Sequence, residues 1–187
     1  MPNGLVVMCD TETDGGGWTI FQRRVTFVVD FYRNWEDYKN GFGDFDAGDF
    51  YLGNENIHCM TVNKTYELRI DMKYLGNSYY AGYTGFLLYS EADFYKISFS
   101  GFYGNTSDSF GAMNNNKPFG TYDKAYDKAS LNCATTYRAA WWFGGCHSAL
   151  LNGNYGNTEY SKGVEWLAIT YYYSSLNFTE MKIRPRV

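Results

Sequence analysis

The sequence lacks the features that identify several large classes of protein. No apolar stretch reaches the roughly 18 residues of a membrane-spanning helix, so we expect no insertion into a membrane. No basic run occurs and the formal net charge is −4, which argues against nucleic acid as a partner. Four cysteines in 187 residues are too few for a disulfide-dense scaffold. Residues 1–9 lack the pattern of a signal peptide, so we interpret the chain as a domain of a longer secreted protein.

Motifs of enzymes and of metal sites are also scarce. The chain has two histidines, His58 and His147, and contains no G-x-S-x-G elbow, no C-x-x-C pair and no P-loop. The pairs His58-Cys59 and Cys146-His147 match no familiar zinc spacing. We therefore expect a protein that is not an enzyme and that holds no zinc.

Aromatic residues are what the sequence has in abundance. They make up 20% of the chain, with 19 tyrosines, beside 45% hydrophobic and 19% charged residues. This composition predicts one globular domain spanning residues 1–187. The excess of tyrosine favours either a crowded aromatic core or a binding surface, because tyrosine combines a large contact area with a polar tip.

Three N-x-[ST] sequons, at Asn63, Asn105 and Asn177, point to the extracellular space. Each one alone carries little weight, since such triplets arise by chance in a chain rich in asparagine. Together they favour a secreted glycoprotein.

Local patterns predict mostly strands. Alternation is clearest at 66–74, where Leu68, Ile70 and Met72 share one face. Short helices are expected at 34–38, with Asn34 as N-cap, and at 54–60, with Asn54 as N-cap. Further strands are expected at 5–8, 18–23, 83–89, 95–99, 164–169 and 178–183, the last of which returns to the sheet. Regular periods are few from 101 to 163, which indicates a loop-rich binding subdomain.

The stretch from Asn132 to His147 contains the strongest candidate for a functional loop. Cys133 and Cys146 bracket it, and a bridge between them would stabilise the fold by roughly 3 kcal/mol. The two glycines before Cys146 permit backbone geometry that other residues resist.

A set of aromatic residues in and after this loop favours a small binding pocket. Tyr137, His147, Tyr160 and Tyr172 lie outside the expected strands or near their ends. Aromatic walls with one or two hydrogen-bonding groups suit a ligand with an apolar tip and a polar amide, such as an acetamido group. Packing in the core is the alternative interpretation for any one of these residues.

A calcium site is the less favoured interpretation of the segment upstream. Asp123 and Asp127 are close enough to share a loop that supplies oxygen ligands. Each aspartate is also followed by a lysine, as is typical of solvated carboxylates, and the spacing alone favours that alternative.

Six motifs occur in one order along nearly the whole chain: CDTETDGGGWTIFQRR (9–24), DFYR (30–33), LGNENIH (52–58), NCA (132–134), AWW (140–142) and TEMKIRP (179–185). Together they resemble the signature of the fibrinogen-related domain, the fold of the fibrinogen C-terminal globule. The resemblance implies an α+β fold with a twisted antiparallel sheet, short helices and a loop-rich C-terminal subdomain. Among the members, the ficolin and tachylectin type and invertebrate defence lectins are the most similar.

The resemblance also implies a site. In the lectins of this family, a pocket for N-acetyl groups lies beside a bridge that here joins Cys133 to Cys146, and the peptide bond leading into the second cysteine is often cis. The matching positions that we expect to bind ligand are Tyr137, Gly145, Cys146, His147, Tyr160, Ser161 and Tyr172. Serine at position 161 replaces the usual alanine, and Leu150 replaces an asparagine beside the pocket.

Calcium and the remaining cysteines are where this chain departs from the family pattern. The two aspartates that usually hold calcium match Ala125 and Asp127, with backbone carbonyls near Ala129 and Leu131 completing the site. One carboxylate is missing, so we expect weak or absent calcium unless Asp123 substitutes. The family's usual partner of Cys9 is absent, and Cys59 stands where members usually have no cysteine. These two cysteines either pair, stay free or form intermolecular bonds.

Two functions follow as hypotheses. The first is a secreted innate-immune pattern-recognition lectin that binds acetylated glycans on microbial surfaces, with oligomers formed through N-terminal regions outside this sequence. The alternative is a protein-interaction module, either a receptor ligand or a partner in a defence complex, without sugar binding. The missing aspartate and Leu150 slightly favour this alternative, because an altered subdomain is typical of a repurposed site.

Overall fold

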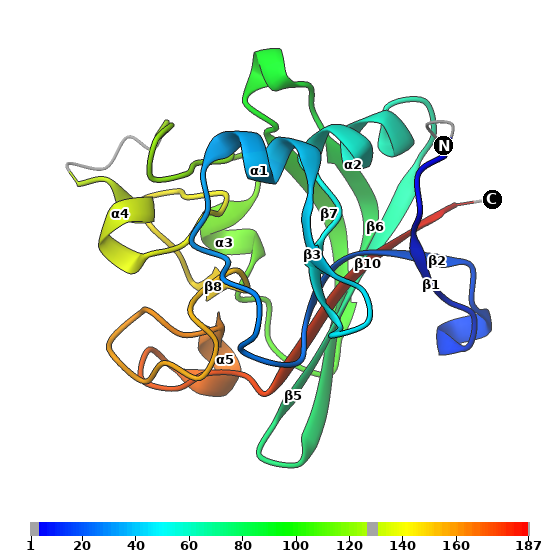
Figure 1. Ribbon diagram of the computed structural model, residues 1–187. Helices are drawn as coiled ribbons and strands as arrows, with labels where there is room; N and C mark the ends of the chain where they lie inside the picture. Colours follow the sequence, from blue (N-terminus) through cyan, green and yellow to red (C-terminus); the bar gives the residue numbers. More distant parts are fainter. Residues whose placement is uncertain (1–3, 127–130, 187) are drawn as a thin grey trace.

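The alternating residues at 66–74 form β5 (Tyr66–Tyr74), whose apolar side chains lie on the buried face of a large sheet. Figure 1 presents the computed structural model, which describes residues 4–126 and 131–186. Neighbouring strands are antiparallel throughout the sheet, in the order β3-β4-β2-β10-β5-β6-β7, with β1 paired to β2. The other strands of this sheet are β1 (Met8–Asp10), β2 (Trp18–Arg24), β3 (Phe42–Asp44), β4 (Asp49–Tyr51), β6 (Asn77–Leu88), β7 (Ile97–Gly104) and β10 (Phe178–Pro185).

The last strand, β10, occupies the middle of the sheet. It pairs with β2 on one side and with β5 on the other, so it joins the two halves of the sheet (Figure 1). Residues 178–183 are therefore confirmed as a strand that returns to the sheet, and the predicted antiparallel sheet with short helices is confirmed with them.

The helices are short, because capping residues start them and residues with unfavourable helical geometry, such as glycine, end them. Asn34 caps α1 (Trp35–Asn40) by accepting a hydrogen bond from the amide of Asp37, and Gly41 ends the helix at a φ of 97°. The predicted helix and its N-cap are confirmed. The other helices are α2 (Asn54–Thr61), α3 (Gly111–Asn114), α4 (Cys133–Tyr137) and α5 (Leu167–Thr170), with 3₁₀ turns η1 (Thr13–Gly15) and η2 (Glu91–Asp93).

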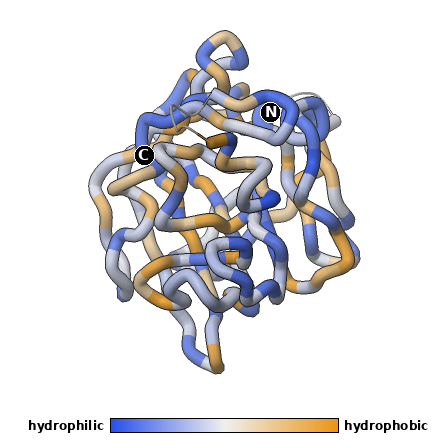
Figure 2. Tube along the Cα trace, turned by 90° about the vertical axis from the view of Figure 1, so that its left-hand side faces the viewer, coloured by the Kyte–Doolittle hydropathy of each residue, from blue (hydrophilic) through white to orange (hydrophobic). Residues whose placement is uncertain are grey.

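One aromatic core joins the sheet to the loop-rich region. Buried side chains of α1, α2 and the sheet belong to the same cluster as buried residues between Phe110 and Leu176. Phe119 packs edge-on against Trp142 at 5.0 Å between ring centroids, and Trp35 stacks on Tyr95 at 5.6 Å. Hydrophobic stretches of the trace are short and alternate with hydrophilic ones (Figure 2). Among the described residues, no helix is long and apolar enough to cross a membrane.

Four expectations about local structure are corrected. The first strand is Met8–Asp10 rather than 5–8, and Gly53 rather than Asn54 precedes α2 as its N-cap. Asn54 is buried, and its side-chain oxygen accepts a hydrogen bond from the hydroxyl of Tyr51 at 2.7 Å. The apolar stretch at 164–169 forms a two-residue strand, β9 (Glu165–Trp166), paired with β8 (Ala149–Leu150), and then turns into α5. Strand β7 also extends to Gly104, so the loop-rich region begins a few residues after position 101.

The opposite face of the sheet carries a buried lysine. The ammonium of Lys182 on β10 lies 2.5 Å from a carboxylate oxygen of Asp10, 2.7 Å from one of Asp71 and 3.1 Å from one of Glu180. Burial raises the pKa of Asp10, but hydrogen bonds from Lys182, Thr13 and backbone amides outweigh it and hold this pKa well below the usual range. The lysine thereby ties strands β1, β5 and β10 together.

Replacing Lys182 by methionine should lower the free energy of unfolding by about 3 kcal/mol at pH 7, because three carboxylates would lose their shared cation. Urea denaturation measures this change. The exposed Lys64→Met variant is the control and should change stability by less than about 0.5 kcal/mol. Asp10 contributes stability above its unfolded pKa of about 3.9 and loses it as the pH falls through its folded value. The difference between wild type and Lys182→Met should therefore shrink below about pH 4, and a difference independent of pH would contradict this account.

Candidate binding site around the Cys133–Cys146 bridge

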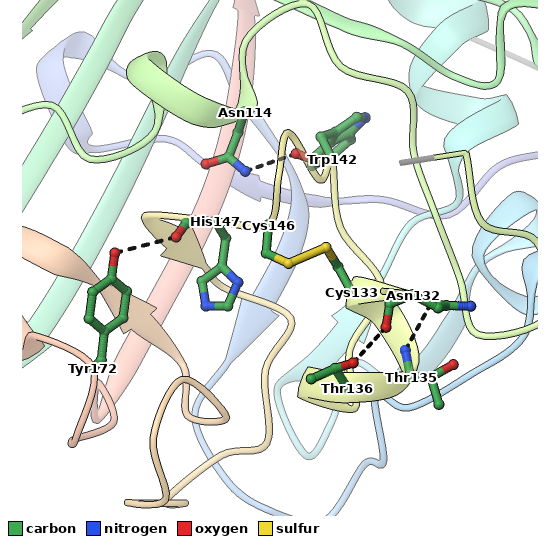
Figure 3. Close-up of a disulfide and its surroundings, with 9 residues drawn as sticks. All are labelled: Asn114, Asn132, Cys133, Thr135, Thr136, Trp142, Cys146, His147 and Tyr172. Atoms are coloured by element: carbon green, nitrogen blue, oxygen red, sulfur yellow. Dashed lines mark hydrogen bonds between the residues drawn. A yellow bond between two sulfur atoms is a disulfide. The ribbon is translucent and has the colours of Figure 1, made fainter. Parts of the chain in front are cut away.

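The bridge between Cys133 and Cys146 forms, and it anchors a short helix. Its two Cα atoms are 5.6 Å apart. Asn132 caps α4: its side-chain oxygen accepts from the amide of Thr135 at 3.0 Å, and its carbonyl accepts from the hydroxyl of Thr136 at 2.9 Å (Figure 3). The first turn of α4 is thus held at one end of the loop by the cap and by the bridge.

The two glycines before Cys146 serve different purposes. A Cβ atom on Gly144 would come within 1.8 Å of the carbonyl oxygen of Met113, so only glycine fits there. Gly145 has open space around it but adopts a φ of 98°, which favours glycine. The bond between Gly145 and Cys146 is trans, since the described residues contain no cis peptide, and the expectation of a cis bond is corrected.

Tyr137, His147 and Tyr172 come together beside the bridge. The rings of Tyr137 and His147 meet edge-on at 4.8 Å between centroids, and Tyr172 lies 6.3 Å from His147. The hydroxyl of Tyr172 points to the carbonyl oxygen of His147 at 3.5 Å (Figure 3). The structure therefore places three of the predicted ligand-binding residues on one aromatic wall.

The imidazole of His147 faces a buried carboxylate that the sequence did not reveal. Nε2 of His147 is 3.5 Å from Oε2 of Glu165, and both side chains are buried. These two atoms and Nδ1 of His147 have no aligned hydrogen-bond partner in the described part of the chain. Burial raises the pKa of Glu165, and the nearby His147 offsets this only partly. Glu165 on β9 is thus the acidic group at this site, and no spacing in the sequence marks it.

Tyrosines extend the site onto the molecular surface. Tyr160, Tyr171 and Tyr173 are 52%, 71% and 66% exposed. The ring of Tyr160 lies 5.5 Å from that of Tyr172 and 5.3 Å from that of Tyr173, between centroids. We call Tyr160, Tyr171 and Tyr173 the tyrosine surface. Tyr160 was expected to bind ligand, whereas the other two were missed, although the run of three tyrosines at 171–173 is a visible signal.

Ser161 and Leu150 lie below this surface. Ser161 is buried at a φ of 60°, and its amide donates to the carbonyl of Tyr172 at 2.8 Å, which fixes the turn that carries Tyr160. Leu150 is fully buried on β8, where it pairs with Glu165, so its side chain lies in the core.

The predicted calcium ligands are only partly described. Asp127 and Ala129 lie outside the described residues, and Leu131 is exposed. Asp123 uses one carboxylate oxygen to accept from the amide of Trp35 at 3.0 Å and from the hydroxyl of Thr121 at 2.7 Å, so it anchors the start of α1. Within 4–126 and 131–186, no cluster of three or more acidic, histidine or cysteine side chains could hold a metal ion.

Cys9 and Cys59 do not pair. Cys9 is an exposed residue of β1, and Cys59 is an exposed residue of α2 whose sulfur lies 3.8 Å from a carboxylate oxygen of Glu55. Of the three alternatives for these cysteines, the structure excludes a bridge between them, because both thiols are free and exposed. The sequon residues Asn63, Asn105 and Asn177 are all exposed.

Comparison with known proteins decides the family. The profile described as "Fibrinogen beta and gamma chains, C-terminal globular domain" matches residues 2–186. The chain belongs to the fibrinogen C-terminal domain family. Its fold is that of the fibrinogen-like globe domain of human ANGPTL2, with a TM-score of 0.93 and 38% identity over 97% of this chain and 86% of that one. The lamprey fibrin D-dimer, solved with the peptide ligand Gly-His-Arg-Pro-amide, gives a TM-score of 0.89 and 32% identity over 96% of this chain and 64% of that one.

The chain spans less than half the length of the curated relatives that it matches. Tenascin-R of Mus musculus is 41% identical over 98% of the chain, which spans 13% of that protein. Fibrinogen C domain-containing protein 1-B of Xenopus laevis is 44% identical over 99% of the chain, which spans 42% of that protein. These relatives establish the family. Similarity to the ficolin and tachylectin type remains a prediction.

Removing the bridge by Cys133→Ser with Cys146→Ser should lower the free energy of unfolding by about 2–4 kcal/mol, because the unfolded chain loses a constraint. Denaturation in guanidinium chloride measures this change in the free energy of unfolding. The double variant Cys9→Ser with Cys59→Ser is the matched control, and its stability should stay within about 0.5 kcal/mol of wild type. Equal losses of stability in the two double variants would contradict the assignment of the bridge to Cys133 and Cys146.

The variant Glu165→Gln should flatten the dependence of stability on pH. The native state holds a proton on Glu165 above the unfolded pKa of about 4.3, so wild type loses stability as the pH rises from there through the raised folded pKa. Glutamine does not titrate, so the variant should lack this loss of stability with rising pH. Urea denaturation at pH 4.5, 6 and 7.5 measures it, with the exposed Glu159→Gln as control. Parallel curves for wild type and Glu165→Gln would show that Glu165 titrates normally.

Proposed function

We propose that this fibrinogen C-terminal domain is an extracellular, non-catalytic module that binds a protein partner through the tyrosine surface. The exposure of Tyr160, Tyr171 and Tyr173 carries the proposal. Tyrosines are enriched among the residues that dominate binding at protein interfaces, because each offers a large rigid contact area and one hydrogen-bonding group. Exposed tyrosine rings add nothing to the core, and those of Tyr160 and Tyr173 lie 5.3 Å apart between centroids.

The comparisons support a protein or peptide partner. The lamprey fibrin D-dimer, which shares this fold, is described as a complex with a peptide ligand. The relatives also include tenascin-R and the globe domains of human ANGPTL2 and ANGPTL6. The Cys133–Cys146 bridge and the three exposed sequons support an extracellular location, since disulfides persist in oxidising compartments.

A second candidate function is recognition of acetylated glycans, as in an innate-immune lectin. The aromatic wall of Tyr137, His147 and Tyr172 favours it, since such walls suit an acetyl group. Either function would operate with weak calcium or none, because Ala125 supplies no carboxylate and Asp123 already holds the start of α1.

The double variant Tyr160→Ser with Tyr173→Ser should weaken binding to cell-surface proteins at least tenfold, because it removes two aromatic anchors. The domain is joined into tetramers to gain avidity, and flow cytometry follows its binding to intact cells. Prior trypsin treatment of the cells should abolish binding, and free N-acetylglucosamine should not compete. Val62→Ser, an exposed apolar residue at the end of α2, is the control and should bind as wild type does.

Two results would overturn the proposal. If the double tyrosine variant, shown by circular dichroism to be folded, binds as wild type does, the tyrosine surface is not the interface. If N-acetylglucosamine displaces the tetramer and Tyr137→Ala abolishes retention on an N-acetylglucosamine resin, the lectin function replaces the protein-binding one.

A further inference from the structure

The three sequons differ in what their asparagine side chains do in the folded domain. Asn63 lies in the turn that follows α2, and its exposed side chain forms no hydrogen bond with any residue of 4–126 or 131–186. Thr65, the third residue of this sequon, is exposed as well. An oligosaccharide is bulky and needs an exposed asparagine, so the amide of Asn63 can carry one without the loss of any contact.

Asn105 uses both polar atoms of its side chain to hold β6. Its oxygen accepts a hydrogen bond from the amide of Tyr80 at 2.7 Å, and Nδ2 donates to the carbonyl of Ser78 at 3.2 Å. Both partners lie on β6, so the hydrogen that Nδ2 donates is the one on the same side as the oxygen. A sugar attached through a trans amide takes the place of this hydrogen, because the trans form puts the substituent beside the oxygen. Glycosylation of Asn105 would therefore break its bond to Ser78.

The side chain of Asn177 is also engaged, directly before β10. Its oxygen accepts from the amide of Leu75 at 3.2 Å, which holds the turn between β5 and β6. The same trans geometry would place a sugar beside this oxygen and against the turn. Thr179, the third residue of the sequon, is fully buried in β10. Of the three sequons, that of Asn63 is therefore the one that the folded domain leaves free.

A groove beside Asn63 offers a surface on which a sugar can lie. Its volume is about 500 Å³, within the roughly 300–1,000 Å³ typical of ligand sites, and Asn63 is one of the residues that line it. Gly85 and Leu87 of β6 pair with Ser100 and Ser98 of β7, and these four residues line the groove too. The groove thus runs from the turn after α2 onto the last two strands of the sheet.

The lining of this groove suits a neutral sugar. The hydroxyl groups of Thr65, Ser98 and Ser100 have no hydrogen-bond partner in the described part of the chain. Val62, which is 49% exposed, adds an apolar wall. Among the described residues that line the groove, Lys64 is the only charged one. An N-acetylglucosamine unit carries no charge and presents both hydroxyl groups and apolar C–H faces, so it matches both kinds of wall.

The turn that carries Asn63 is fixed at both ends. Oγ1 of Thr61 accepts from the amide of Leu88 at 3.3 Å, and the carbonyl of Thr65 accepts from the amide of Arg186 at 2.9 Å. The linked sugar is therefore held next to the groove. Because this association is intramolecular, weak contacts are enough to keep the sugar there.

We infer that the domain carries an N-linked glycan on Asn63, and that the first N-acetylglucosamine of this glycan lies in the groove. Asn105 and Asn177 stay unmodified. The sugar covers apolar surface of Val62 and Leu87 that otherwise meets water. The inference shares the extracellular location with the proposed function, and it does not depend on which partner the tyrosine surface binds.

Glycopeptide mass spectrometry of the domain, secreted from mammalian cells, tests the choice of site. It should find a glycan on Asn63 and none on Asn105 or Asn177. Peptide-N-glycosidase should shift the mobility of wild type and of Thr65→Ser, which keeps the sequon, but not that of Asn63→Gln or Thr65→Ala. The control Ser107→Ala, which removes the sequon of Asn105, should behave as wild type does. An unmodified Asn63, or a glycan on either of the other two asparagines, would overturn the inference.

The place of the sugar is tested on the same glycoprotein after its glycan has been trimmed to one N-acetylglucosamine. Nuclear Overhauser spectra should show contacts from the sugar to the methyl groups of Val62 and Leu87. Leu75, which is 74% exposed on the turn after β5, is the control and should show none. A sugar that contacts neither Val62 nor Leu87 points into solvent, and this result would overturn its placement in the groove.

Discussion

The place of β10 in the sheet is the constraint on which the rest of the structure depends. Strands β1 to β4 lie on one side of it and β5 to β7 on the other, and among the described residues no other strand connects the two groups. The large sheet is thus complete only when the last described residues are in place. Lys182 reinforces this junction, because its ammonium is shared by carboxylates on β1, on β5 and on β10 itself. The loop-rich region leaves the sheet after β7 and returns at β10, so both of its ends are fixed on the sheet.

The loop-rich region has few regular backbone hydrogen bonds, and large side chains fix its position instead. The indole N–H of Trp142 donates to the carbonyl of Tyr95, and that of Trp166 to the carbonyl of Ser107. Each of these hydrogen bonds joins the loop-rich region to a segment that flanks β7, the edge strand of the sheet. The side chain of Asn114 binds the carbonyl of Trp142 and so fixes α3 against the loop that ends in Cys146 (Figure 3). Loops anchored in this way can present exposed tyrosines without losing their shape, as a binding surface requires.

Features that arise from neighbouring residues could be predicted from the sequence, and features that arise from distant ones could not. Asn34 and Asp37 are three positions apart, so the cap of α1 is local, and the alternation of β5 is local too. The position of β10 between β2 and β5 depends on pairing across more than 100 residues, which no short pattern records. Residues 164–169 have a composition that suits a strand, yet only two of them form one.

The same distinction applies to the candidate sites. Tyr137 and His147 were found because one lies inside the loop that the Cys133–Cys146 bridge closes and the other directly follows it. Glu165 was missed, because a buried charge is recognised only once its surroundings are known. The extent of the tyrosine surface was missed for the same reason, since exposure is a property of the folded chain.

The end of α4 connects the aromatic wall of Tyr137, His147 and Tyr172 to a cavity lined by Arg24 and Arg138. Tyr137 packs on His147, and the next residue, Arg138, adopts a φ of 52° and lines the cavity of Arg24. The left-handed turn at Arg138 is therefore what directs two consecutive side chains to different sites. On the other side of the cavity, Arg24 holds the carbonyl of Gly153, where the loop to Tyr160 begins. Loss of Arg24 would therefore disturb the start of the loop that carries Tyr160.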